Sequence, residues 1–231
     1  SVRWGATRSM GWRTPTPSAA KKKMWGIREG ATLELVPDAV AATDAEVAGL
    51  RARAATEEPR TFSAFGRTCR MHRRQLFFGP AGGYTFSRLT VPSETVPDPL
   101  VTRCLEVAQR WLPGANAALV NYYTDGSDYI SAHSDDEPVH AGAAVLTFSF
   151  GTTRTFRIRD KKTRTQLLDL ELPSHSVAVM GGPAFQAELT HEVPVQKRRG
   201  GWRLSVTVRL FAESAHAPPA PGAASPPPTG W

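Results

Sequence analysis

Apolar and polar residues alternate most clearly near the carboxyl end, in Arg203–Phe211. Side chains two positions apart on a strand point to the same face, so this period predicts a strand with one apolar and one polar face. Arg203 and Arg209 share the polar face, and their Cα atoms would lie about 20 Å apart on an extended strand. Two guanidinium groups placed in this way can bind a short dicarboxylate between them, whereas the plain alternative is a solvated strand face.

Seven further strand-like runs precede this strand, and two helical patterns precede them. Helical spacing of apolar residues in Pro37–Ala55 and in Asp98–Leu112 predicts two supporting helices. Short strands that follow helices indicate an α+β chain, mostly β, with a double-stranded β-helix (jelly-roll) core. The earlier strands are expected at Ala118–Tyr123, Tyr129–His133, Ala144–Phe150, Thr155–Arg159, Gln166–Leu172, Ser176–Met180 and Ala187–Glu192.

The two ends of the chain lack such periodicity. Residues 1–30 carry seven Lys or Arg and a single acid, and this composition predicts a basic flexible tail. Residues 213–231 are rich in Ala and Pro and predict a disordered tail. We therefore expect one domain at residues 31–212.

Most of the formal charge of +7 belongs to the first 30 residues, which leaves +1 for residues 31–231. Within the domain, however, basic residues are concentrated in the segments 60–74, 154–164 and 197–203. Such segments can clamp a phosphate backbone around a site, and solvated loops are the alternative.

No apolar run approaches the length of a membrane span, and the amino-terminal segment lacks the apolar core of a secretory signal. Cys69 and Cys104, the two cysteines, have neither metal-ligand nor disulfide-framework spacing. They are typical of free thiols in a reducing compartment. We expect an intracellular monomer, in the nucleus or the cytoplasm, with no membrane partner.

The candidate chemistry centres on His133 and Asp135. Their side chains lie two positions apart, so on a strand both can contact one metal ion from the same side. His191 is the best third ligand, because a closed sheet can bring its segment opposite the first pair; His175 is its rival. Two His and one carboxylate form the facial triad of non-haem Fe(II) oxygenases, which leaves positions open for a cosubstrate and O₂. A His-x-Asp pattern alone is a weak signal.

Further motifs surround these residues, namely Asn121-x-Tyr123, Glu137 after the His-x-Asp pair, Arg203 with Arg209, Gly79–Arg88 and Phe148–Phe156. In this order they resemble the AlkB family of Fe(II)- and 2-oxoglutarate-dependent nucleic-acid dealkylases, over about residues 63–211. The resemblance implies hydroxylation of an N-methyl group on a base of the 1-methyladenine or 3-methylcytosine type. Formaldehyde, succinate and CO₂ would be released.

The resemblance also implies roles for residues around the cosubstrate, while the three ligands above hold Fe(II). Arg203 and Tyr123 would bind the far carboxylate of 2-oxoglutarate, and Asn121 would reach the metal-side carboxylate. Arg209 would contact that carboxylate or steady the carboxylate ligand. Ser205 stands where many relatives have Asn, and this shorter donor implies a weaker or water-bridged hold on the cosubstrate.

The resemblance assigns residues of about 60–90 to a lid that recognises the nucleotide. Within the lid, Phe65 resembles the aromatic finger of a duplex-acting member. Outside the lid, Glu137 matches an acidic contact to the exocyclic amine of the base. Tyr84 and Phe86 would stack against a flipped base, although both also suit the core of a strand. The expected substrate contacts are Phe65, Arg73, Tyr84, Phe86, Ser87 and Glu137.

The substrate polymer stays open between DNA and RNA. We favour single strands, because Ser134–Pro138 and Gly79–Pro80 resemble a single-strand-acting member, whereas Phe65–Arg67 resembles a duplex-acting one. One rival is a 2-oxoglutarate oxygenase acting on a protein side chain, and the basic segments argue against it. Another rival is a noncatalytic nucleic-acid-binding jelly roll, and the intact triad with both arginines argues against that.

Overall fold

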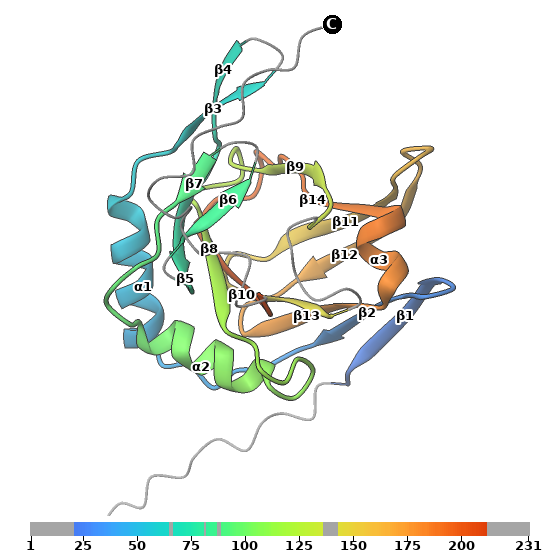
Figure 1. Cartoon of the computed structure of the whole chain (residues 1–231), viewed down its shortest axis with the longest axis horizontal. Helices are drawn as coiled ribbons and strands as arrows, with labels where there is room; N and C mark the ends of the chain where they lie inside the picture. Colours follow the sequence, from blue (N-terminus) through green and yellow to red (C-terminus); the bar gives the residue numbers. More distant parts are fainter. Residues whose placement is uncertain (1–20, 65–66, 81, 87–88, 136–142, 212–231) are drawn as a thin grey trace, which may run out of the picture.

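The computed structural model describes residues 21–64, 67–80, 82–86, 89–135 and 143–211. Two antiparallel sheets face each other, and two helices cover the outer face of the larger sheet (Figure 1). This is the predicted mostly-β jelly roll with two supporting helices. Residues 1–20 and 212–231, where tails were predicted, lie outside the described residues.

The larger sheet consists, in spatial order, of β1 (Lys23–Arg28), β2 (Ala31–Val36), β13 (Ser176–Gly181), β10 (Val145–Gly151), β15 (Arg203–Arg209), β8 (Ala117–Tyr123) and β5 (Arg74–Phe78). The smaller sheet consists of β12 (Gln166–Leu172), β11 (Arg154–Asp160), β14 (Leu189–Val193) and β9 (Ile130–His133). Two separate hairpins are formed by β3 (Thr61–Ala64) with β4 (Arg67–Arg70) and by β6 (Tyr84–Phe86) with β7 (Leu89–Val91).

The first helix, α1 (Asp44–Thr56), begins later than the predicted Pro37. Thr43 forms a capping box with Glu46, in which the Thr43 side chain accepts from the Glu46 N–H and the Glu46 carboxylate accepts from the Thr43 N–H. This cap sets the start of the helix. The second helix, α2 (Pro99–Ala108), begins at Pro99 because the Asp98 side chain caps its first N–H groups.

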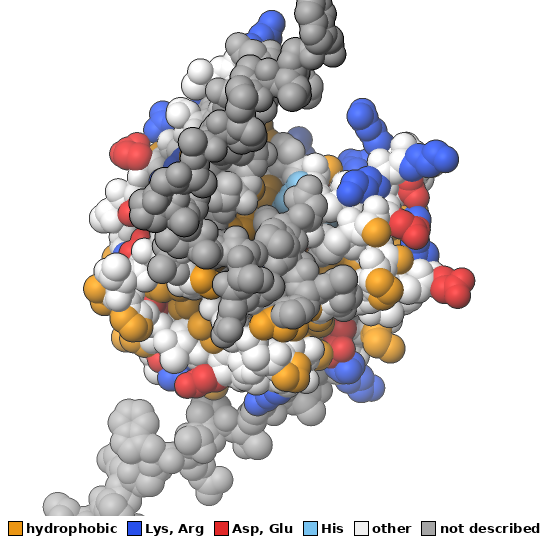
Figure 2. Space-filling view, in the orientation of Figure 1, with side chains coloured by type: hydrophobic (Ala, Val, Ile, Leu, Met, Phe, Trp, Pro, Cys, Tyr) orange, Lys and Arg blue, Asp and Glu red, His pale blue; other side chains and the backbone are white. Residues whose placement is uncertain are grey.

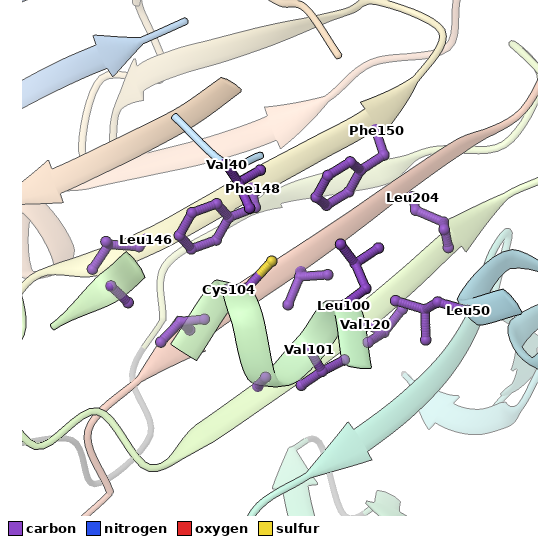
Figure 3. Close-up of a cluster of buried hydrophobic side chains, with 14 of the residues drawn as sticks. Val40, Leu50, Leu100, Val101, Cys104, Val120, Leu146, Phe148, Phe150 and Leu204 are labelled. Atoms are coloured by element: carbon purple, nitrogen blue, oxygen red, sulfur yellow. The ribbon is translucent and has the colours of Figure 1, made fainter. Parts of the chain in front are cut away.

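The outer face of the larger sheet and the two helices form one apolar core. Leu100 and Cys104 of α2 lie against Phe148 and Phe150 of β10, and all four are at most 1 % exposed (Figure 3). A second apolar cluster fills part of the space between the two sheets, where Tyr123 of β8 and Phe156 of β11 both contribute. The outer core therefore fixes the larger sheet, while its inner face carries both this second apolar cluster and polar groups.

Strand β15 contributes side chains both to the core under the helices and to a cavity on the inner face of the larger sheet. Leu204, Val206 and Val208 belong to the core under the helices. Arg203, Ser205, Thr207 and Arg209 line a cavity on the inner face. The predicted alternation is confirmed, but the polar face is buried rather than solvated.

Three expectations about element boundaries were wrong. The segment 23–30 was assigned to the tail, yet β1 is an edge strand of the larger sheet, because Trp25 and Ile27 pack against the inner cluster. The proposed lid of about 60–90 contains β5, whose residues 75–78 are buried beside β8, so only the flanking hairpins remain for a lid. The strand predicted to start at Ala187 begins at Leu189, because a short helix, α3 (Pro183–Glu188), follows Gly182.

None of the helices in the part of the chain that is described is long and apolar enough to cross a membrane.

The outer core generates a stability prediction. Replacement of Phe148 by Ala removes a fully buried ring, and we expect the free energy of unfolding to fall by about 3–5 kcal/mol. Leu167 is 41 % exposed, so Leu167→Ala should change it by less than roughly 0.5 kcal/mol. Urea unfolding followed by fluorescence measures both, and equal losses would contradict this assignment of the core.

Candidate functional site

A cavity of about 400 Å³ opens between the inner faces of the two sheets. Strands β8 and β15 of the larger sheet and β9 and β14 of the smaller sheet supply its walls. In Figure 2 a pale blue His side chain is visible in the hollow of this face. The cavity is therefore the place where residues of both sheets can act on one ligand.

Three predicted metal ligands meet in this cavity. His133 and His191 are direct partners in the antiparallel pair of β9 and β14, so their rings lie 4.3 Å apart between centroids. The His191 Nε2 atom lies 3.6 Å from Asp135 Oδ2, and the His133 Nε2 atom lies 3.9 Å from Asp135 Oδ1. One ligand atom from each residue falls within 4.8 Å of the others, which is the spacing of a group that can hold a metal ion.

The histidines are kept in the form that binds metal. The His133 Nδ1 atom lies 2.9 Å from the Ser131 carbonyl oxygen; donation to this oxygen leaves the Nε2 lone pair for an ion. Burial lowers the pKa of His133, and burial, with a smaller effect of the neighbouring His133, lowers the pKa of His191 to about 3. Both rings are therefore neutral near pH 7, as metal coordination requires.

Asp135 is a buried carboxylate with a buried cation beside it. Arg209 Nη2 donates to Asp135 Oδ1 at 2.5 Å, and the Asp135 N–H donates to Gln186 Oε1. Burial by itself would raise the pKa of Asp135, but the charge of Arg209 and the nearby histidines hold it below the ordinary value. Asp135 Oδ2 has no hydrogen-bond partner among the described residues, so this oxygen is left for an ion.

Arg203 lies in the same cavity, at the start of β15, and is 1 % exposed. Its Nη2 donates to Ser149 Oγ at 2.9 Å, and Nε and Nη1 have no hydrogen-bond partner in the described part of the chain. Its guanidinium carbon lies 5.2 Å from the centre of the Tyr123 ring. A buried guanidinium with two open donors is a site for a carboxylate, which matches the predicted role of Arg203 and Tyr123.

Asn121 connects the strands β5 and β8 beside the cavity. Its side-chain oxygen accepts from Arg73 Nε at 2.8 Å and from Gln75 Nε2 at 3.0 Å. The Asn121 amide nitrogen is then the atom left for a ligand. Ser205 pairs with Asn121 in the strand register and also lines the cavity.

The predicted substrate residues divide into two groups. Tyr84 and Phe86 line the cavity, with their ring centres 5.3 Å apart, and Tyr84 is also packed against Phe77. The two alternatives for these aromatic residues are therefore compatible, since a buried ring can also form a wall. Phe65, Ser87 and Glu137 lie outside the described residues.

The three basic segments are less open than predicted. Arg154 is buried, and Arg157 and Arg159 form ion pairs with acids of the smaller sheet. Arg60 and Arg70 of the first segment and Arg199 of the third are also paired with Glu residues. Of the second segment, Lys161, Lys162 and Arg164 are exposed beyond β11, and Lys161 lines the cavity. Figure 2 shows Lys and Arg side chains gathered at this end, beside the hollow.

Two residues of the site were missed from the sequence. Gln75 and Ser149 hold Asn121 and Arg203, and both lie on buried strands. Gln75 stands two positions after Arg73, so a strand period could have placed it on the same side. His175, the rival third ligand, lies elsewhere, with its backbone N–H bonded to the Ser149 carbonyl and its ring against Phe150.

The residues present fit Fe(II) and 2-oxoglutarate. The metal side offers two neutral imidazoles and the Asp135 Oδ2 atom, which has no hydrogen-bond partner among the described residues. The opposite side offers the open donors of Arg203, and the cavity between them has room for a small dicarboxylate. An oxygen and nitrogen donor set of this type suits non-haem Fe(II).

Comparisons with known proteins show which family the chain belongs to. A model of the 2OG-Fe(II) oxygenase superfamily matches residues 41–209. The chain is similar to DNA oxidative demethylase ALKBH2 of Mus musculus, with 34 % identity over 157 residues that cover 63 % of this chain and 64 % of the relative. For ALKBH2 of Homo sapiens the identity is 33 % over 164 residues, covering 63 % and 59 %.

The alpha-ketoglutarate-dependent dioxygenase alkB homolog 3 of Mus musculus is 32 % identical over 146 residues, which cover 58 % of this chain and 51 % of that relative. The alignments thus span less than two thirds of the length of these relatives. The solved structure of OsALKBH1 shares the fold, with a TM-score of 0.53 and 18 % identity over 82 % of this chain and 100 % of that one. The chain belongs to the 2OG-Fe(II) oxygenase superfamily and, within it, to the AlkB family of dioxygenases that its motifs predicted.

Proposed function

We propose that this protein is a dioxygenase that removes N-methyl groups from bases of the 1-methyladenine or 3-methylcytosine type in DNA or RNA. One observation carries the proposal. His133, Asp135 and His191 lie together in a cavity that also contains a buried Arg203 with open donors. The relatives named DNA oxidative demethylase support the choice of substrate.

His133, Asp135 and His191 would hold Fe(II), and Arg203 with Tyr123 would hold the far carboxylate of 2-oxoglutarate. When bound, Fe(II) and 2-oxoglutarate supply, with O₂, the oxidation that hydroxylates an N-methyl group and yields formaldehyde, succinate and CO₂. The protein orients these groups and keeps water away from them. Arg209 steadies Asp135 through their buried hydrogen bond. The Asn121 amide nitrogen would donate to the metal-side carboxylate, since its side-chain oxygen already accepts from Arg73.

A methylated Watson–Crick edge is hidden inside a duplex, so the enzyme must receive the base unpaired. Tyr84 and Phe86 form an aromatic wall of the cavity and would stack against that base. Arg73 lines the same wall and would contact the nucleotide. Glu137, Phe65 and Ser87 retain their roles in the proposal from the sequence resemblance alone.

Lys161 and Lys162, at the end of β11, carry no ion pair within the described residues and would contact phosphates beside the cavity. The electrostatic part of such binding is independent of base sequence. We favour single strands on the motifs Gly79–Pro80 and Ser134–Pro138, with a monomer as the active form. The free thiols Cys69 and Cys104 are compatible with the nucleus or the cytoplasm.

The central prediction concerns oligonucleotides of single-stranded DNA and RNA that carry one 1-methyladenine or 3-methylcytosine. With Fe(II) and 2-oxoglutarate, mass spectrometry should show the loss of one methyl group, and single strands should react faster than duplexes. The variant His191→Ala should be inactive, while His175→Ala, outside the metal group, should retain activity.

The outcomes of this assay separate the parts of the proposal. Consumption of 2-oxoglutarate with no change in any oligonucleotide would retain the oxygenase and overturn the nucleic-acid substrate. The lack of any 2-oxoglutarate consumption by the iron-loaded protein would overturn the oxygenase itself.

A second prediction tests how Asp135 is held. Arg209→Met leaves Asp135 buried without its cation, so its pKa should rise and Mn²⁺ affinity at pH 7 should fall by roughly 10–100-fold. The control Arg53→Met removes an ion pair with Glu94 on the far side of the sheet and should leave the affinity unchanged. Calorimetric titration with Mn²⁺ measures both, and unchanged affinity in Arg209→Met would show that the pair does not support the metal.

A third prediction tests the basic end of β11. The double variant Lys161→Ala, Lys162→Ala should bind a single-stranded oligonucleotide more weakly, with a plot of log affinity against log salt that is less steep by about 0.7 per lost phosphate contact. Arg110 is exposed just after α2, away from the cavity, and Arg110→Ala is the matched control. Fluorescence anisotropy at several salt concentrations gives the slopes. If the double variant and the control have the same slope, these lysines do not contact phosphates.

A further inference from the structure

Two connecting segments pack closely at one end of the cavity. Residues 124–129 join β8 to β9, and residues 194–202 join β14 to β15. The Gln196 N–H donates to the Gly126 carbonyl at 2.7 Å, and a Cβ added to Gly126 would lie only 2.1 Å from the Gln196 oxygen. The contact is tight enough that only glycine fits at position 126. We call this packed pair of segments the loop junction.

Arg154, the first residue of β11, holds the loop junction together. Its side chain is 1 % exposed, and each nitrogen of its guanidinium group donates to a residue of the junction. Nε donates to Gln196 Oε1 at 3.0 Å, and Nη1 donates to the Asp125 carbonyl at 3.1 Å. Nη2 donates to the carbonyls of Asp128 at 2.9 Å and Pro194 at 2.7 Å. One planar side chain therefore ties together two segments that are distant in the sequence.

The loop junction adjoins the four strands that carry Tyr123, His133, His191 and Arg203. The first segment begins after Tyr123 and leads to the strand of His133. The second segment follows the strand of His191 and leads to Arg203. A displacement of the junction would therefore move the groups assigned to the far carboxylate before any others, because Tyr123 and Arg203 are directly attached to it.

The charge of Arg154 is not neutralised by a contacting acid. Its acceptors are carbonyl and amide oxygens, and among the described residues no carboxylate forms an ion pair with it. Burial lowers the pKa of Arg154, although the Asp128 and Asp125 carboxylates partly offset this effect. The guanidinium carbons of Arg154 and Arg203 lie 5.9 and 5.2 Å from the centre of the Tyr123 ring. Two buried cations thus share one aromatic neighbour.

The two cations influence each other. The positive charge of Arg154 contributes to the lowered pKa of Arg203, after the larger effect of burial. A bound carboxylate beside Arg203 would offset this repulsion between the two cations. The two arginines together therefore attract an anion more strongly than Arg203 would alone. Four of the five N–H groups of Arg154 donate to the junction, and Arg154 is not among the residues that line the cavity, so it acts on that anion through its charge and not by contact.

We propose that Arg154 is a positioning residue for the cosubstrate, which fixes Tyr123 and Arg203 through the loop junction and adds a second positive charge at the far-carboxylate end. This inference rests on the proposed function, since it concerns how 2-oxoglutarate is chosen. A residue with a purely structural role would affect all ligands of the cavity alike. Arg154 instead sets the preference for a ligand with a far carboxylate.

The test compares two ligands that differ in that carboxylate alone. 2-Oxoglutarate and 2-oxopentanoate share the oxo-acid end, and the second lacks the far carboxylate. Their affinities for the Mn²⁺-loaded protein are measured by calorimetry, in the absence of turnover, for the wild type, Arg154→Met and Arg154→Lys. Arg157→Met is the matched control, because Arg157 lies on the same strand but pairs with Asp169 at the surface.

We expect the preference for 2-oxoglutarate over 2-oxopentanoate to fall by roughly fivefold or more in Arg154→Met, with 2-oxopentanoate affinity nearly unchanged. Arg154→Lys keeps a charge but loses the planar fork, so it should lie between the wild type and Arg154→Met. Arg157→Met should match the wild type. Thermal unfolding identifies any variant that does not fold. If Arg154→Met does not fold, the ligand preference of Arg154→Lys tests the proposal.

The ratio of the two affinities tests the role of Arg154 separately from the proposed function. A ratio equal to that of the wild type in the folded Arg154 variants would overturn the inference while leaving the proposed function intact. A parallel loss of affinity for both ligands would also overturn it, because it would show a general structural role. If the wild type itself did not prefer 2-oxoglutarate, the proposed function would fail and this inference with it.

Discussion

In the part of the chain that the structure describes, three arginine side chains are buried, and the cost of burying their charge constrains the structure around them. Arg154, Arg203 and Arg209 are each at most 3 % exposed. A buried cation is tolerated only with hydrogen bonds or an opposite charge. Arg154 donates hydrogen bonds to carbonyl oxygens, and Arg209 donates to the carboxylate of Asp135. Among the described residues, Arg203 forms one side-chain hydrogen bond, to Ser149, and its unsatisfied donors are the physical basis for expecting an anionic cosubstrate.

The jelly roll separates the tasks of stability and chemistry by strand face. On β15 the apolar side chains join the core under α1 and α2, and the polar side chains line the cavity. The helices stabilise the larger sheet from outside, so its inner face can carry charged groups at their required positions. The smaller sheet supplies both histidines through the pairing of β9 with β14, and this register sets the spacing of His133 and His191.

Much of the site followed from strand periodicity and motif order. The period of two placed Arg203 and Arg209 on one face, and the expectation of a closed sheet placed His191 opposite His133 and Asp135; the structure contains both arrangements. Contacts between distant segments could not be read in this way. The edge strand β1 has Lys and Arg among its apolar residues, so its composition suggested a tail. Arg154 belongs to a segment whose many basic residues suggested an exposed surface. Their burial depends on tertiary neighbours, which no local pattern contains.

The account depends most directly on whether iron and 2-oxoglutarate occupy this cavity together. Anaerobic titration of the Fe(II) protein with 2-oxoglutarate, followed by visible absorption, tests this, since chelation of Fe(II) by the oxo acid produces a charge-transfer band. The proposed site predicts a band that saturates at one equivalent of Fe(II) and one of 2-oxoglutarate per protein. The band should be lost in His191→Ala, and in Arg203→Met its half-saturation should require a much higher 2-oxoglutarate concentration. A band that His191→Ala leaves unchanged, or the absence of any band in the wild type, would contradict it.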